Sequence, residues 1–76
     1  MLKTIRNIIC AYIDISPDEI TEDSKIRSDI GLNSFDLVNV AVDLEKEYGV
    51  SVDSKAFGGL KTVGDLMKYI EELKTS

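Results

Sequence analysis

Residues 34–48 constrain the fold most strongly, because their apolar side chains recur at the period of an α-helix. One side of a helical wheel collects Leu37, Val40, Ala41, Leu44 and Tyr48. Such a stripe is typical of a helix that buries one face against a core. Gly49 follows where a left-handed residue commonly ends a helix. The sequence therefore predicts a helix over residues 34–48 with a buried face that other elements must cover.

Further helices are predicted before and after this one. In residues 2–14 one stripe carries Leu2, Ile5, Ile9, Tyr12 and Ile13. A last helix is expected to start after a Thr62 cap and to run through about Leu73. Residues 53–57 are expected to form one extra helical turn that stops at Gly58 and Gly59. No sheet is predicted.

The connection between the first two long helices is long and mostly polar. Ser16, Pro17 and Glu19 predict a short helical turn with a serine cap and a capping box. The rest of the connection is punctuated by Ile20, Ile26, Ile30 and Leu32. Because long structureless loops are uncommon in compact domains, we expect these side chains to anchor the loop to the core. The fold class is therefore all-α, with three principal helices and one short helix in a single domain of residues 1–76.

The charge balance limits the classes of partner. The 76-residue chain has 14 acidic and 9 basic side chains, a net charge of −5 and no histidine. Such a chain repels nucleic-acid phosphates, so we expect partners with basic surfaces and no nucleic acid. No segment approaches the roughly 20 apolar residues of a membrane span. A lone Cys10 fits a reducing cytoplasm.

Catalytic and metal-binding signals are weak in this sequence. Without histidine or an obvious carboxylate pair, nothing is expected to act as a general base at neutral pH. Residues 14–18 faintly resemble the start of a calcium loop, but the required glycine and closing glutamate are missing. We therefore expect a monomeric protein that is not an enzyme and has no metal site.

Ser34 is the residue most suggestive of chemistry. It follows Gly31 and begins the predicted helix, so its hydroxyl is expected to be exposed at the positive end of the helix macrodipole. An attached phosphate is favoured at such a place. Serine is also a common N-cap, and its position alone favours the interpretation of Ser34 as a plain cap.

The stretch Gly31-Leu32-Asn33-Ser34-Phe35 resembles the Gly-x-Asp-Ser-Leu attachment site of the acyl carrier protein family. The chain length, the helix order, the long loop and the acidic charge are similar to that family as well. The resemblance implies a small four-helix bundle of the acyl-carrier type. It also implies a phosphopantetheine arm esterified to Ser34, on which acyl intermediates are held as thioesters. Asn33 stands where the family has an aspartate that helps the transferase hold its metal and position the serine.

The resemblance also implies a docking surface on the helix after Ser34. Phe35, Val38 and Val42 form a second apolar stripe, which the family presents to partners. Alternatively, the third helix covers part of it. An acidic stripe beside it, expected to steer basic partners, consists of Asp36, Asp43 and Glu47. Asn33 is included in this surface. The implied partners are a phosphopantetheinyl transferase and acyl synthases or transferases with basic docking patches.

Three functions remain open at this point. The first is an acyl carrier of fatty-acid or polyketide-type biosynthesis. The second is an aminoacyl or peptidyl carrier of a nonribosomal pathway, which is usually less acidic near the serine. The third is a helical interaction module in which Ser34 only caps a helix. The net charge of −5 favours the first over the second.

Overall fold

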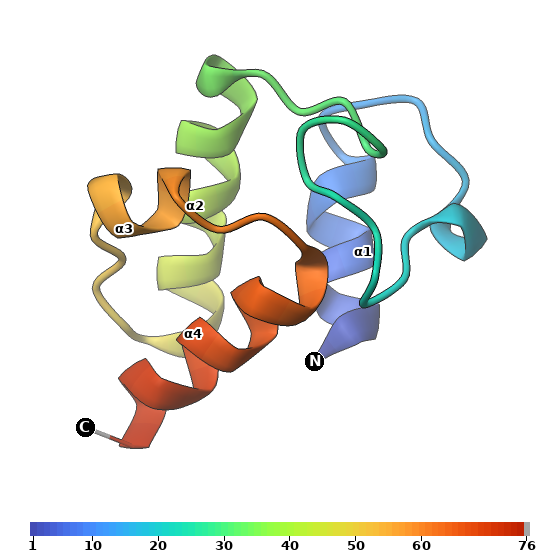
Figure 1. The fold of residues 1–76 in the computed structure, drawn as a ribbon. Helices are drawn as coiled ribbons and strands as arrows, with labels where there is room; N and C mark the ends of the chain where they lie inside the picture. Colours follow the sequence, from blue (N-terminus) through green and yellow to red (C-terminus); the bar gives the residue numbers. More distant parts are fainter. Residues whose placement is uncertain (76) are drawn as a thin grey trace.

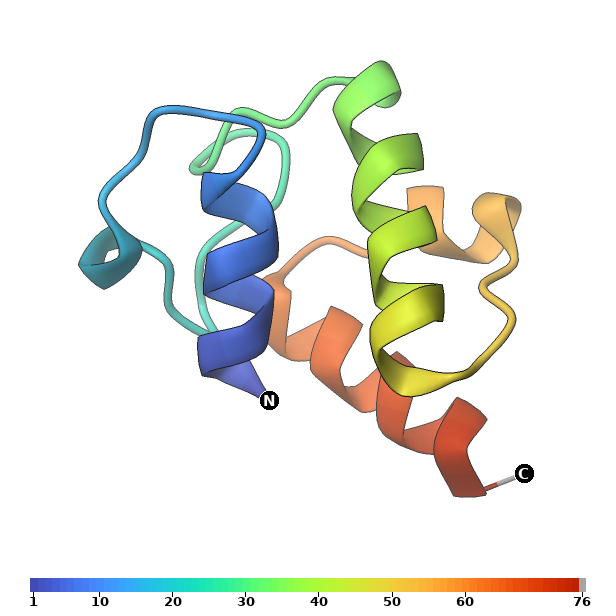
Figure 2. The same ribbon diagram turned by 180° about the vertical axis from the view of Figure 1, so that it is seen from behind.

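The computed structural model describes residues 1–75. The order of its elements is α1 (Leu2–Cys10), the 3₁₀ turn η1 (Pro17–Glu19), α2 (Ser34–Tyr48), α3 (Ser54–Gly58) and α4 (Val63–Thr75). Figures 1 and 2 show α2 between α1 and α3, with α4 crossing below them. Within the described residues there is no strand, only an isolated antiparallel bridge between Lys25 and Thr62. The predicted all-helical class and helix order are confirmed.

The core is built from the faces that the sequence periodicity predicts. In α2 the buried residues are Leu37, Val40, Ala41 and Leu44. Ile5 and Ile9 face them from α1, and the buried face of α4 adds Val63, Leu66 and Ile70. Phe57 is the buried residue of α3, so this short helix is attached to the core through one aromatic side chain. No helix in the described part of the chain is both long and apolar enough to cross a membrane.

One predicted helix end and one predicted capping box are wrong. The helix expected over residues 2–14 ends at Cys10. The amides of Ala11 and Tyr12 donate hydrogen bonds to the carbonyls three residues back, at 3.2 and 3.0 Å, which is the pattern of a 3₁₀ turn. The capping box at Ser16 does not form either. In the three-residue turn η1 the Glu19 amide donates to the Ser16 carbonyl at 2.9 Å, and the Ser16 side chain makes no cap hydrogen bond.

Other helix ends are confirmed. Gly49 adopts a left-handed conformation (φ 66°, ψ 36°) and ends α2, a geometry that glycine adopts without strain. At the start of α4 the Asp65 amide donates to Thr62 Oγ1 at 3.1 Å, and the Thr62 amide donates to Asp65 Oδ2 at 3.2 Å. This reciprocal pair is a capping box that closes the helix N-terminus.

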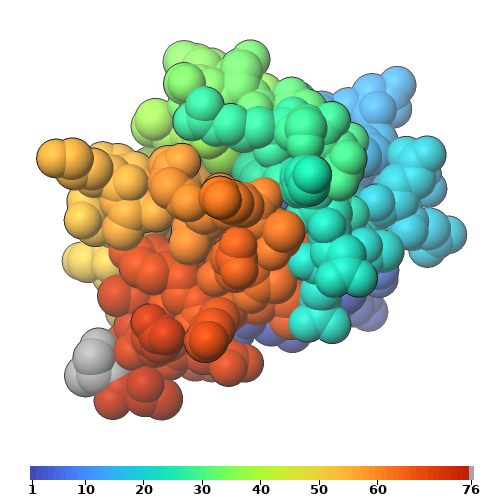
Figure 3. All heavy atoms as spheres, viewed as in Figure 1, coloured from blue at the N-terminus to red at the C-terminus, as the bar shows by residue number. Residues whose placement is uncertain are grey.

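The long loop is held on both of its sides. Its predicted anchors are all buried: Ile20, Ile26, Ile30 and Leu32. The loop also exchanges backbone hydrogen bonds with the start of α4, from Ile26 to Lys61 at 2.9 Å and from Val63 to Ser24 at 3.0 Å. Figure 3 shows the loop resting against this part of the chain. The loop is therefore a fixed wall of the molecule, and it delivers the chain to the start of α2.

Candidate functional site

Ser34 is the first residue of α2, and Asn33 is its N-cap. Asn33 Oδ1 accepts a hydrogen bond of 2.8 Å from the Asp36 amide. The interpretation of Ser34 as a cap is therefore wrong, because the neighbouring side chain already satisfies that amide. The Ser34 side chain is exposed, and within the described residues its hydroxyl has no hydrogen-bond partner.

Gly31 sets the path of the chain into this site. Its φ of 89° lies in the left-handed region, which strains any residue with a Cβ. The buried residues Ile30 and Leu32 flank it, so the backbone must turn sharply between two core anchors. No atom lies within 4 Å of the place where a Cβ would be, so the requirement for glycine is conformational and not steric. Ser34 is consequently presented on backbone that is fixed from the loop side.

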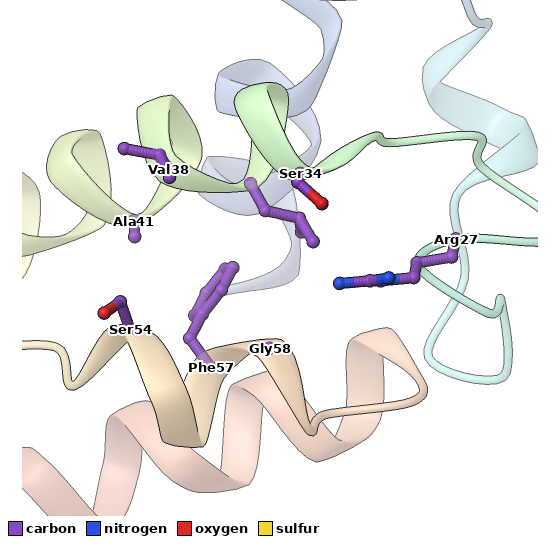
Figure 4. A pocket seen from close by; sticks show the side chains of 8 residues that line it. Arg27, Ser34, Val38, Ala41, Ser54, Phe57 and Gly58 are labelled. Atoms are coloured by element: carbon purple, nitrogen blue, oxygen red, sulfur yellow. The ribbon is translucent and has the colours of Figure 1, made fainter.

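A pocket of about 170 Å³ opens beside Ser34, between α2 and α3. Its apolar lining comes from Leu37, Val38 and Ala41 on α2 and from Phe57 on α3 (Figure 4). Arg27 from the long loop stands at the other side of the pocket. Ser34 is thus at the edge of a mainly apolar hollow with one cation beside it.

The second apolar stripe of α2 lies at the surface. Phe35 is 74% exposed, Val38 57% and Val42 41%. The short helix α3 covers part of Val38, which lines the pocket, as the alternative of partial cover expects, but the stripe as a whole stays at the surface. Large apolar side chains exposed together beside Ser34 are typical of an interaction surface.

The acidic stripe lies on the α1 side of α2, away from the apolar stripe. Asp43 and Glu47 line a hollow between α1 and α2, whereas Val38 faces α3. At 100° per residue, Asn39 and Lys46 fall between the two stripes. The sequence predicts that the stripes are direct neighbours, but the structure separates them with these two side chains.

Asp43 has a partner that the sequence reasoning missed. Its carboxylate accepts a hydrogen bond from the Tyr12 phenol, which lies just beyond the end of α1. The pKa of Tyr12 is raised above its ordinary value. The largest cause is this hydrogen bond, and desolvation and the charge of Asp43 contribute less. The sequence predicts Tyr12 in the core stripe, but the tight turn after Cys10 brings it to the surface. Asp43 is therefore partly engaged within the protein, while Glu47 is exposed and Asp36 half-buried.

Arg27 was also missed. It follows the buried Ile26 and is exposed, like Ser28 and Asp29 after it. Nothing in the sequence indicates that it faces Ser34, because this direction depends on how the loop packs on α4. Among the described residues no group of three or more histidine, cysteine, aspartate or glutamate side chains is placed to hold a metal ion.

Comparison with known proteins gives one consistent result. A family model described as a phosphopantetheine attachment site matches residues 3–70. The chain is 37% identical over 72 residues to the acyl carrier protein of Thermotoga maritima, covering 95% of this chain and 89% of the relative. It is 40% identical over 74 residues to the acyl carrier protein of Rhodococcus erythropolis, covering 97% and 81%. It is 37% identical over 74 residues to the meromycolate extension acyl carrier protein of Mycobacterium leprae, covering 97% and 64%.

Proposed function

Because the chain belongs to the phosphopantetheine-binding acyl carrier protein family, whose members are carriers and not catalysts, we propose that Ser34 bears its arm. The protein then shuttles acyl intermediates between the enzymes of fatty-acid or polyketide-type biosynthesis, and residues 1–76 form one carrier domain. The observation that carries this proposal is the free, exposed Ser34 hydroxyl at the first position of α2, beside an apolar pocket.

The residues around Ser34 fit a phosphopantetheine group. An ester at its hydroxyl breaks no hydrogen bond, because Asn33 and not Ser34 caps α2. The helix N-terminus favours the negative charge of a phosphodiester. When bound, the arm supplies a terminal thiol that holds acyl groups as thioesters. The contribution of this chain is to hold the attachment point still and exposed.

The surface of α2 supports docking of partner enzymes. We assign Phe35, Val38 and Val42 to apolar contact with the transferase and the acyl synthases. Asp36 and Glu47, together with the net charge of −5, attract basic patches on these partners and raise the rate of encounter. Asn33 keeps the cap of α2 but lacks the charge of the family's aspartate, so the transferase meets a neutral ligand there.

The pocket beside Ser34 supports an aliphatic cargo. Its 170 Å³ compares with an apolar cavity of about 150 Å³ that holds one benzene molecule, which corresponds to about six carbons. One relative is named for meromycolate extension, and that name also favours a lipid-type acyl group. Each methylene that the pocket removes from water contributes about 0.8 kcal/mol.

Melting temperatures of acylated forms test this cargo. We expect the melting temperature to rise with chain length up to about six carbons in the pocket, and to rise less steeply beyond that because longer chains must part α2 and α3. Ala41→Leu fills the pocket from α2 and should blunt the rise. A melting temperature that is the same for all chain lengths would favour a polar or aminoacyl cargo held outside the bundle.

Intact mass after incubation with a phosphopantetheinyl transferase and coenzyme A tests the attachment site. Wild type should gain the mass of one phosphopantetheine. Ser34→Ala should gain none, while the matched control Ser28→Ala, another exposed serine near the start of α2, should load like wild type. A loaded Ser34→Ala variant would refute the assignment.

We further propose that the protein acts in the cytoplasm as a monomer. Cys10 is its only cysteine, so the chain needs no oxidising compartment for an internal disulfide. Sedimentation equilibrium of the loaded protein measures the oligomeric state, and a stable dimer would contradict the second part of this proposal.

A further inference from the structure

A cluster of basic side chains lies next to Ser34 in an otherwise acidic protein. Lys25, Arg27 and Lys61 line a hollow of about 430 Å³ between the long loop and the end of α3. This hollow shares Arg27 and Gly58 with the pocket beside Ser34, so the two lie next to each other. Within the described part of the chain none of the three cations has an ion-pair partner. A chain with net charge −5 thus keeps three unpaired cations together beside its attachment site.

The backbone under Arg27 is fixed. The preceding residue, Ile26, is buried, donates its amide to the Lys61 carbonyl at 2.9 Å and accepts from the Leu32 amide at 3.2 Å. The hydrogen bond from Ile26 therefore holds Lys61 next to the loop segment that carries Lys25 and Arg27. Figure 4 shows the Arg27 guanidinium and the Ser34 hydroxyl pointing into the same pocket from opposite sides. Arg27 is the only basic side chain that lines this pocket.

An anion on Ser34 has few other partners. The side chain of Asn33 already takes up the Asp36 amide, and Asp36 places a carboxylate in the first turn of α2. One backbone amide of the first turn of α2 is thus already hydrogen-bonded, and part of the positive charge of the helix dipole is already offset, before any phosphate is attached. An arginine guanidinium presents a planar set of donors that matches two phosphate oxygens at once, and such charge-assisted pairs are the stronger hydrogen bonds in proteins.

We propose that Arg27 binds the phosphodiester that joins the arm to Ser34, and that Lys25 and Lys61 add to the positive potential there. The inference rests on the proposed function of Ser34. The contact directs the root of the arm across the pocket toward the long loop that carries Arg27. Because Arg27 is exposed, the contact exchanges readily and weakens as salt rises, so a partner enzyme can release the arm.

Nuclear magnetic resonance of the loaded protein tests this role directly. Loading is first verified by intact mass, and the Arg27 Nε–Hε resonance is then compared between the unloaded and loaded forms. We expect this resonance to shift on loading and to return toward its unloaded position as salt rises. The backbone amides of α4, which lie away from the pocket, should not move.

Thermal melting gives a second readout. We expect loading to raise the melting temperature of wild type, relative to that of Arg27→Gln, by about 1–8 °C, as one exposed ion pair allows. The matched control Lys68→Gln removes the same charge from an exposed position on α4 and should behave like wild type. The unloaded Arg27→Gln protein should melt close to unloaded wild type, because Arg27 has no partner to lose.

Suppose that the mass shows the arm to be attached. An Arg27 resonance that does not shift, or an equal change of melting temperature on loading in wild type and Arg27→Gln, would then overturn the role of Arg27 and leave Ser34 as the attachment site. Failure of wild type to load with an active transferase would overturn both proposals together. The two outcomes are distinguished by the mass measurement alone.

Discussion

Replacing Asn33 with alanine should weaken α2 at its start, because the Asn33 side chain is the acceptor for the Asp36 amide at 2.8 Å. Loss of an asparagine N-cap to alanine costs typically about 1 kcal/mol, within a range of roughly 0.5–2 kcal/mol. For a domain of about 60–100 residues, each kcal/mol lowers the melting temperature by about 4–8 °C. Asn33→Ala should therefore melt about 4–8 °C below wild type.

Two neighbouring variants serve as controls. Asn33→Asp retains an acceptor and adds a negative charge at the positive end of α2, so its stability should lie within about 0.5 kcal/mol of wild type. Ser34→Ala removes no hydrogen bond from the described structure and should also stay within about 0.5 kcal/mol. Any difference in loading rate between wild type and Asn33→Asp then reports contact with the transferase and not folding.

Circular dichroism or calorimetric melting of the unloaded proteins at neutral pH measures these differences. The reasoning is refuted if Ser34→Ala loses as much stability as Asn33→Ala, since the cap would then be the serine. An Asn33→Ala variant that melts with wild type would refute it as well, because the hydrogen bond to Asp36 would contribute nothing.

The remaining predictions concern the two flanks of α2. Asp36→Lys or Glu47→Lys should lower the on-rate for the transferase, and the difference should shrink as salt rises; stopped-flow association at several salt concentrations measures it. Val42→Asp should weaken transferase binding with little salt dependence, and equal affinities for these variants and wild type would place the docking surface elsewhere. The raised pKa of Tyr12 means that the folded state holds the phenol proton more tightly than the unfolded chain, so this stabilisation is present below pH 10.0 and lost as pH rises through the raised pKa. Urea unfolding between pH 9 and 11 should show an alkaline loss that is smaller in Tyr12→Phe; an identical loss would assign it to other groups.

Periodic burial explains what was predictable from the sequence. The four buried residues of the α2 stripe and the loop anchors Ile20 and Ile26 were predicted correctly, because burial of apolar side chains spaced along one helix face, or isolated in a polar loop, is favourable. Gly49 was predictable for a different reason, since its left-handed backbone is a local property of the chain.

Features that depend on tertiary geometry were not predictable. Asn33 and Ser34 are adjacent and both are good caps, so only the extended backbone of Asn33 decides which one serves. The early end of α1 moves Tyr12 from the expected core stripe to Asp43. The position of Arg27 beside Ser34 follows from the hydrogen bond between the loop and Lys61, a contact between residues far apart in the sequence.

The central claim is that Ser34 carries the phosphopantetheine arm. Its most direct test is peptide mapping by tandem mass spectrometry of the wild-type protein after loading by a transferase. We expect a single modified residue, Ser34, in the peptide that joins the long loop to α2. An arm found on Ser28, Ser54 or any other residue, or no modified peptide in the presence of an active transferase, would contradict it.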